Sequence, residues 1–255
     1  MNQHMRHNTA CKTCSLSPLC LPVSLSFSEM DRLDDIIERG RPIEKGQYLF
    51  RQGDPMESVF AIRTGTIKSF ALTRAGEEQI TGFHLPSEIL GLSSFGTQHH
   101  QVSARALETT NVCEIPLEHL ERLSSQLPEL GRQVMRVMGR EIREDQQMML
   151  LLSKKSAEER LASFLLSLAQ RFKRRGYSEH NFRLTMSRSD MANYLGLAVE
   201  TVSRVFTRLQ KSGIIADTGS AREVHIADQK RLCDMASLSE GERVELGLIE
   251  TTTTH

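Results

Sequence analysis

The sequence predicts an α+β protein in which a small antiparallel β-roll (jelly roll) is followed by a long helix and a winged helix-turn-helix. Three observations predict this fold. Glycines separate short strand-forming runs in the first half, an unbroken helical pattern follows, and a basic region with helix-turn-helix spacing comes after it. With 255 residues, the chain is long enough for two modest domains. We expect five segments, at residues 1–27, 28–125, 126–152, 153–235 and 236–255, the last of them disordered.

The first segment, residues 1–27, is rich in cysteine. Cys11, Cys14 and Cys20 lie within ten residues of one another, and apolar residues surround the last of them. In a chain whose start shows no secretion signal, clustered cysteines are more often metal ligands than disulfides. A zinc ribbon needs a second Cys-x2-Cys pair, which this sequence lacks, so the spacing favours an iron–sulfur cluster. Zinc binding and unligated thiols remain the alternatives.

A fourth ligand would have to come from Cys113 or Cys233. Cys113 lies in the extended run TTNVCEIP, which would hold its thiol on a rigid strand end. Cys233 lies in DQKRLCDMASL, where an apolar packing role is the better interpretation. The sequence therefore favours Cys113.

Residues 28–125 have the pattern of a small β domain. Short runs such as YLF, SVFAI, TIKSFALT and EEQITGFHL alternate with glycine-containing turns. His84 is expected to be a strand histidine with a hydrogen-bond partner, and His99 and His100 to be solvated loop residues. No His-x-His pair with a following carboxylate is present, so we expect no catalysis here.

Residues 126–152 predict one long helix that begins near Pro128. One seam of this helix steps by four and three residues, the spacing of a coiled coil, so we expect it to pair with its copy in a dimer. Asp145 lies in this otherwise apolar seam, where two facing carboxylates would repel each other. A dimer weakened in this way could act as a switch; alternatively, Asp145 lies at the rim or packs against its own β domain. The expected dimer residues are Met135, Met138, Ile142, Asp145 and Met149.

Residues 153–235 carry the basic charge of the chain. Between residues 153 and 214 there are twelve basic and five acidic residues, a net charge of +7 that the rest of the chain balances. Ser187 and Asp190 predict an N-terminal capping box, Ala192 is small enough for a helix crossing, and Gly196 suits a tight turn. Residues 214–228 predict a β-hairpin wing. Charge and spacing together predict a DNA-binding winged helix-turn-helix.

The outer face of the second helix carries side chains that suit DNA. Arg204 can bind guanine with two hydrogen bonds, Glu200 can accept one from cytosine, and Ser203 is a short, versatile contact. The further contacts that we expect, mainly to phosphates, come from Arg188, Thr207, Arg208 and Lys211.

Several ordered stretches carry a family resemblance: CKTCSLSPLCLP, GEEQITGFHLP, EIREDQQMMLLLSKKSAEERLA and MSRSDMANYLGLAVETVSRVF. Together they resemble the FNR branch of the Crp/Fnr transcription regulators, over roughly Cys11 to Ala236. The resemblance implies a cytoplasmic homodimer that binds double-stranded DNA and has no enzymatic turnover. It also implies a global regulator of anaerobic metabolism that activates or represses genes through RNA polymerase, with surface loops such as Thr73–Glu78 as candidate polymerase contacts.

The same resemblance implies specific roles for residues of this chain. An oxygen-labile 4Fe–4S cluster, one per monomer, would be bound by Cys11, Cys14, Cys20 and Cys113. Leu19 would help to shield it, and oxygen would convert it through 2Fe–2S to apoprotein. Cluster binding would overcome the repulsion at Asp145, so that the loaded protein dimerises and the apoprotein is monomeric. Glu200, Ser203 and Arg204 match base-reading residues for palindromic TTGAT-type sites.

Two rival functions differ in testable features. A cyclic-nucleotide-responsive activator would need Gly-Glu and Arg-Ser pairs in its pocket, but the corresponding stretch EILGLSSFGTQHHQVSARALE has Gly-Leu and Gln-Val. Without that arginine a buried phosphate would lack its counter-charge, although Arg105 lies nearby. If the chain were an electron-transfer iron–sulfur protein, the basic charge of residues 153–214 would have no function. We therefore expect no cyclic nucleotide, and no membrane association because no apolar run approaches the ~20 residues of a span.

Overall fold

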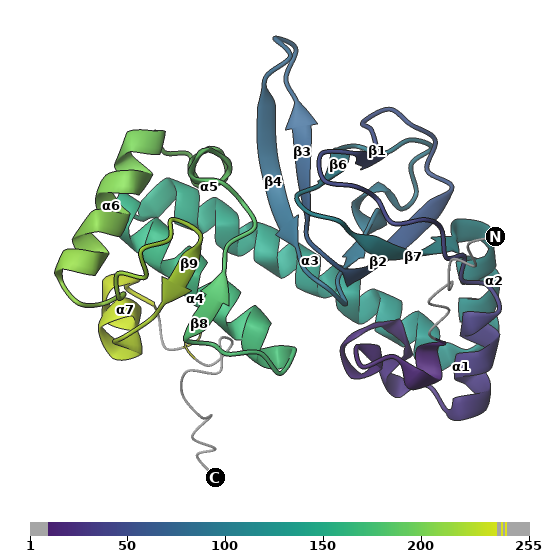
Figure 1. Cartoon of the computed structure of the whole chain (residues 1–255). Coiled ribbons are helices and arrows are strands. Elements are labelled where there is room, and N and C mark those ends of the chain that lie inside the picture. The colour runs from purple at the N-terminus through teal and green to yellow at the C-terminus, as the bar shows by residue number, and fades with distance from the viewer. Residues whose placement is uncertain (1–9, 239–240, 242, 244–255) are drawn as a thin grey trace, which may run out of the picture. The chain divides into compact units, whose positions relative to one another are not determined.

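The chain forms two sheets and then a mainly helical region, joined by one long helix (Figure 1). The computed structural model describes residues 10–238, 241 and 243. It divides the chain into two compact units, with the boundary between Arg143 and Glu144 inside that helix. Of the tail that was predicted to be disordered, residues 236–255, the structure describes residues 236–238, 241 and 243. Ala236 and Leu238 are buried, so the first residues of this segment belong to the folded unit. Among the described residues, no helix has the length and apolar character that crossing a membrane would require.

The first unit contains the predicted β-roll. Its two antiparallel sheets have the strand orders β1-β6-β3-β4 and β5-β2-β7. The strands are β1 (Tyr48–Phe50), β2 (Ser58–Thr64), β3 (Ile67–Leu72), β4 (Glu78–His84), β5 (Ile89–Leu90), β6 (Ser103–Ala106) and β7 (Asn111–Pro116). Buried side chains from both sheets, such as Ile62, Ile67 and Ala104, form a shared core. The short strand-forming runs between glycine-containing turns therefore predicted this domain correctly.

Helices cover one end of this unit. Three short 3-10 turns, η1 (Cys11–Thr13), η2 (Ser17–Leu19) and η3 (Leu21–Ser24), lead into α1 (Phe27–Asp34). A capping box of Ser26 and Glu29 fixes the start of α1. The helix α2 (Leu117–Gln126) follows β7 directly, and Leu33, Leu120 and Leu130 are fully buried with apolar residues of β2 and β7.

One prediction for the β domain is wrong. His100 is only 3% exposed, and its ring stacks on that of Phe50 with centroids 3.8 Å apart. Burial lowers the pKa of His100, which favours the neutral ring. His99 is exposed as expected, and His84 has the expected partner, because its Nε2 atom lies 2.9 Å from Ser69 Oγ.

The long helix α3 runs from Pro128 to Lys154, so it begins at the expected proline and ends two residues beyond the expected segment. The rest of the second unit consists of α4 (Ala157–Arg174), β8 (Asn181–Arg183), α5 (Arg188–Leu195), α6 (Val199–Lys211), β9 (Glu223–His225) and α7 (Gln229–Met235). Cys233 is buried in α7, as the packing interpretation predicted.

The wing differs in part from the prediction. Residues 214–228 do return antiparallel, with Ile215 bridged to Ile226. However, the main partner of β9 is β8, and the sequence analysis did not identify that strand. Phe182 and Val224 face each other in this pair and are both buried, which explains why β9 pairs outside its own hairpin.

Candidate functional site

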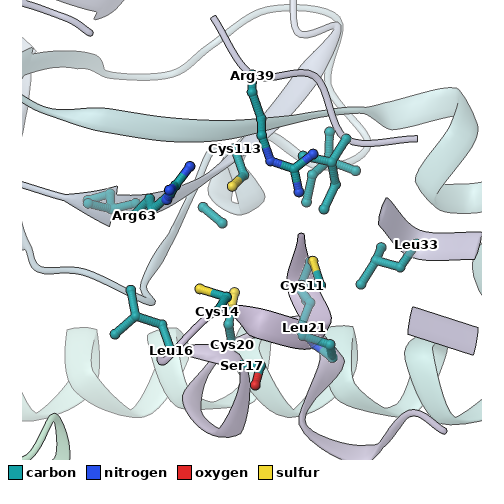
Figure 2. Close-up of a pocket in the computed structure, with 15 residues that line it drawn as sticks. Cys11, Cys14, Leu16, Ser17, Cys20, Leu21, Leu33, Arg39, Arg63 and Cys113 are labelled. Carbon is teal, nitrogen blue, oxygen red and sulfur yellow. The ribbon is translucent and has the colours of Figure 1, made fainter. Parts of the chain in front are cut away.

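Three cysteines of the N-terminal turns and a fourth from a distant strand line one cavity (Figure 2). The total empty volume of the cavity, including the part open to solvent, is about 500 Å³. Cys11 begins η1, Cys14 ends that turn, and Cys20 lies between η2 and η3. Cys113 comes from β7, where it pairs with Ala61 of β2. The fold therefore brings together the four predicted ligands, with Cys113 rather than Cys233 as the fourth.

Two arginines, Arg39 and Arg63, also line this mainly apolar cavity. Neither arginine was predicted from the sequence. Arg63 follows two residues after Ala61, the strand partner of Cys113, and lines the same cavity. Arg39 lies outside any recognisable motif. The apolar lining comes mainly from Leu16, Leu21, Pro22, Leu33, Ile37, Ile62 and Ile115.

Asp34 connects the N-terminal turn that begins at Cys11 with Arg39. Its carboxylate accepts a hydrogen bond from the backbone N–H of Cys11 at 2.9 Å and forms an ion pair with Arg39. Burial alone would raise the pKa of Asp34, but these hydrogen bonds outweigh it and hold the pKa below its usual value. Arg39 keeps one buried donor, Nε, without a partner among the described residues. The cavity thus contains a fixed positive group with unused hydrogen-bonding capacity.

Burial makes three of the four cavity thiols harder to ionise. Burial raises the pKa of Cys20 to about 12 and also raises the pKa values of Cys11 and Cys113. Arg39 and Arg63 lower the pKa of Cys113, but burial prevails. A metal centre would therefore have to displace protons from these thiols as it binds.

Cys11, Cys14, Cys20 and Cys113 offer four thiols around one shared space. In an iron–sulfur cluster each thiolate binds a different iron atom, so the ligands stand farther apart than around one zinc ion. The donor set therefore fits a cluster bound by four cysteines.

Leu19 does not line the cavity, although it precedes Cys20. Leu16 and Leu21 occupy the lining positions on either side of the η2 turn. The shielding role that the resemblance implied for Leu19 is therefore not visible as a direct cavity contact.

A second site is the helix-turn-helix, which forms as predicted. Ser187 and Asp190 make a reciprocal capping box at the start of α5. Gly196 ends α5 in the left-handed conformation, at φ 62°, which favours glycine. Ala192, Val202 and Val205 are buried between the helices. These local features fix α6 with one face turned away from the protein.

The exposed face of α6 carries the side chains predicted to contact DNA. The exposed residues are Glu200, Ser203, Arg204, Thr207, Arg208 and Lys211. Arg208 already has an acidic partner, because it forms an ion pair with Glu158 of α4. Arg204 makes a long contact from Nη2 to Thr201 Oγ1, at 3.3 Å. On this face Arg204 is therefore exposed, whereas Arg208 is paired with a carboxylate of the same chain.

Arg188 differs from these extended side chains. Its guanidinium lies over the ring of Phe206, with 3.2 Å between Cζ and the ring centroid. Burial lowers the pKa of Arg188 to about 10. This side chain packs α5 against α6, and a phosphate contact would require it to leave the ring.

The predicted dimer seam of α3 is largely uncovered in the single chain. The side chains of Met135, Ile142 and Met149 are 74%, 57% and 69% exposed. Asp145 is also exposed, whereas Met138 is half-buried against the core of the first unit. Partial desolvation raises the pKa of Asp145.

Comparisons with known proteins agree with this architecture. The cyclic nucleotide-binding domain family matches residues 40–126, and the Crp-like helix-turn-helix domain family matches residues 159–235. The solved structure of FixK2 from Bradyrhizobium japonicum has a TM-score of 0.73 and 30% identity. That match covers 80% of this chain and 99% of the other.

Two curated relatives are more similar in sequence. The transcriptional activator protein Anr of Pseudomonas aeruginosa is 64% identical over 226 residues, which cover 89% of this chain and 92% of the relative. The fumarate and nitrate reduction regulatory protein of Escherichia coli is 56% identical over 209 residues, which cover 82% of this chain and 84% of the relative. These relatives are transcription factors and not enzymes. The chain therefore belongs to the FNR/Anr branch of the Crp/Fnr family of DNA-binding transcription regulators.

Proposed function

We propose that this regulator senses oxygen through a 4Fe–4S cluster, one per chain, bound by Cys11, Cys14, Cys20 and Cys113. The observation that carries the proposal is the shared cavity of these four thiols, which come from the N-terminal turns and a distant strand. When bound, the cluster would supply a centre that oxygen destroys. The residues of the chain hold it, exclude water with an apolar lining and bring positive charge to the thiolates through Arg39 and Arg63.

We propose that cluster binding controls assembly of a homodimer through α3. The support is the exposed apolar seam at Met135, Ile142 and Met149, because a lone chain leaves this surface in water. Asp145 opposes dimerisation because its carboxylate would face that of the second copy. Cluster binding by the first unit would have to offset this cost in free energy. Without the cluster, the chain would be monomeric.

We further propose that the dimer binds palindromic TTGAT-type sites and regulates genes of anaerobic metabolism in the cytoplasm. Glu200, Ser203 and Arg204 are exposed on α6 in positions suited to base edges. The turn between β3 and β4 is exposed at residues 72–77, and the Thr73–Glu78 loop is our candidate contact for RNA polymerase.

We do not assign a cyclic nucleotide as the signal. Arg105, which lies a few residues along the chain from the position where a phosphate-binding arginine is expected, donates a hydrogen bond to Glu78 at 2.7 Å and packs over Phe70. A phosphate would have to replace this internal carboxylate. Titration with cyclic AMP should therefore leave DNA affinity unchanged, and a marked increase would favour the nucleotide-responsive alternative.

The deciding experiment measures iron and acid-labile sulfide per chain in protein prepared without oxygen. About four of each per chain are expected for one 4Fe–4S cluster. The matched control is Cys233→Ser, which should keep this content, whereas Cys113→Ser should lose it. Zinc, or no metal, in the wild-type chain would contradict the oxygen sensor and leave a DNA-binding regulator whose signal lies elsewhere.

A further inference from the structure

Arg160, in the first turn of α4, joins three separate segments of the second unit. Its Nη2 atom donates to the carbonyl oxygen of Leu152 at 2.8 Å, and its Nε atom donates to that of Lys155 at 2.9 Å. Its Nη1 atom donates to the carbonyl oxygens of Leu195 at 3.0 Å and Gly196 at 3.5 Å. One side chain thus contacts the last turns of α3, the start of α4 and the turn of the helix-turn-helix.

The acceptors of Arg160 are groups that helices leave unsatisfied. The last carbonyls of a helix have no partner within it and carry partial negative charge. Leu152 lies near the end of α3, and Leu195 and Gly196 lie at the end of α5. A guanidinium can satisfy both ends at once because its donors diverge in one rigid plane, which a lysine ammonium cannot reproduce.

Other groups already cap the start of α4 and close the turn after α5, so Arg160 is not needed for either. The N-terminus of α4 is capped by Ser156 and Glu159. The turn after α5 is closed by the backbone N–H groups of Gly196 and Leu197, which donate to carbonyls within α5. The contacts of Arg160 therefore connect segments rather than complete one of them.

Gly196 has neighbours on two sides. A Cβ atom at this position would lie at ordinary van der Waals distance, 3.5 Å, from both Arg160 Nη1 and Leu152 Cδ2. The end of α3 therefore lies beside the turn before the recognition helix α6, and Arg160 donates hydrogen bonds to both.

We propose that Arg160 is a positioning residue that fixes the orientation of α5 and α6 relative to the C-terminal end of α3. This inference rests on the proposed dimer, in which two copies of α3 pair. The orientation then sets the separation of the two recognition helices, and with it the half-site spacing that the dimer accepts. Arg160 would thus determine spacing specificity without contacting a base.

The test uses chain prepared without oxygen and compares wild type with Arg160→Gln and Arg160→Lys. Affinity is measured for a palindrome of the preferred spacing, for palindromes lengthened or shortened by one base pair, and for a duplex with one half-site. Arg174→Gln is the control, because it removes the same charge from an exposed position at the other end of α4. The oligomeric state and helix content are recorded for every sample.

We expect Arg160→Gln to reduce the preference for one spacing by about fivefold or more, with single half-site affinity changed less than about twofold. Arg160→Lys keeps the charge but not the planar set of donors, and should show a smaller reduction in the same direction. Arg174→Gln should keep the wild-type preference.

Two results would overturn the inference while leaving the dimer intact. Either both Arg160 variants keep the wild-type spacing preference, or all duplexes lose affinity equally, which indicates a purely structural role. If Arg160→Gln does not fold, Arg160→Lys decides by the same measure. A wild-type chain with no spacing preference at all would overturn the proposed dimer and this inference together.

Discussion

Arg39 brings a positive charge into a cavity lined mostly by thiols and apolar side chains. Four thiolates bound to a metal centre would bring negative charge into the same poorly solvated space. Arg39 is held in place by Asp34, which also accepts the backbone N–H of Cys11. The arginine is therefore connected through Asp34 to Cys11, the first of the proposed ligands, as residues that orient metal ligands are in many metal sites.

We expect Arg39→Gln to weaken retention of the cluster, because it removes this charge and releases Asp34. The loss of cluster absorbance in air should become faster, by on the order of tenfold. The control is Arg41→Gln, at an exposed position two residues away that does not line the cavity. Equal rates of absorbance loss in wild type and Arg39→Gln would show that Arg39 has no part in holding the cluster.

What the sequence could and could not predict follows from the range of the contacts involved. The capping box of Ser187 and Asp190 and the turn at Gly196 depend on neighbours within a few residues, so they were predictable. His100 is buried because Phe50, from a distant strand, stacks on it. Arg39 reaches the cavity only through the packing of the N-terminal turns against β2 and β7. The cysteines were identified because their spacing is itself a chemical pattern, whereas a single arginine has no such pattern.

At the scale of elements, Glu158 of α4 would compete with a DNA phosphate for Arg208 of α6. The ion pair between Arg208 and Glu158 places a carboxylate where a phosphate oxygen would bind. The pair is solvent-exposed, so it contributes little to stability, but binding a phosphate requires either breaking it or tolerating a nearby negative charge. The strand β8 is a second element that could not be predicted from local sequence, because its partner β9 lies some forty residues later in the chain.

We expect Glu158→Gln to increase DNA affinity by a few-fold at low salt, equally for all sequences, because it frees a phosphate-binding arginine. The dependence of affinity on salt should steepen by up to about one unit of slope. Arg208→Ala should have the opposite effect, and adding Glu158→Gln to it should change nothing further. Salt titrations of all four proteins on one specific and one unrelated duplex measure this. An increase confined to the specific duplex would contradict the phosphate interpretation.

At the scale of the whole molecule, the charges and the apolar seam belong to different tasks. The excess of +7 between residues 153 and 214 suits a polyanion such as DNA. In the proposed dimer, the exposed apolar seam of α3 would face its copy. Asp145 interrupts that seam, so the free energy of the proposed dimerisation would depend on the balance between apolar burial and the cost of bringing two carboxylates together.

This balance predicts that dimerisation of the metal-free chain depends on pH. Desolvation already raises the pKa of Asp145 in the single chain, and the approach of a second Asp145 would raise it further. The dimer then binds more protons than two monomers, so association strengthens as pH falls and is lost as pH rises through the raised pKa. Sedimentation of the apoprotein at about pH 5 and about pH 7.5 should show more dimer at the lower pH. Asp145→Asn should remove that difference, and Asp145→Ala should dimerise at both pH values without any cluster. If Asp145→Ala stays monomeric at both, the apolar seam alone is too weak to pair, and the cluster must contribute contacts beyond offsetting this carboxylate.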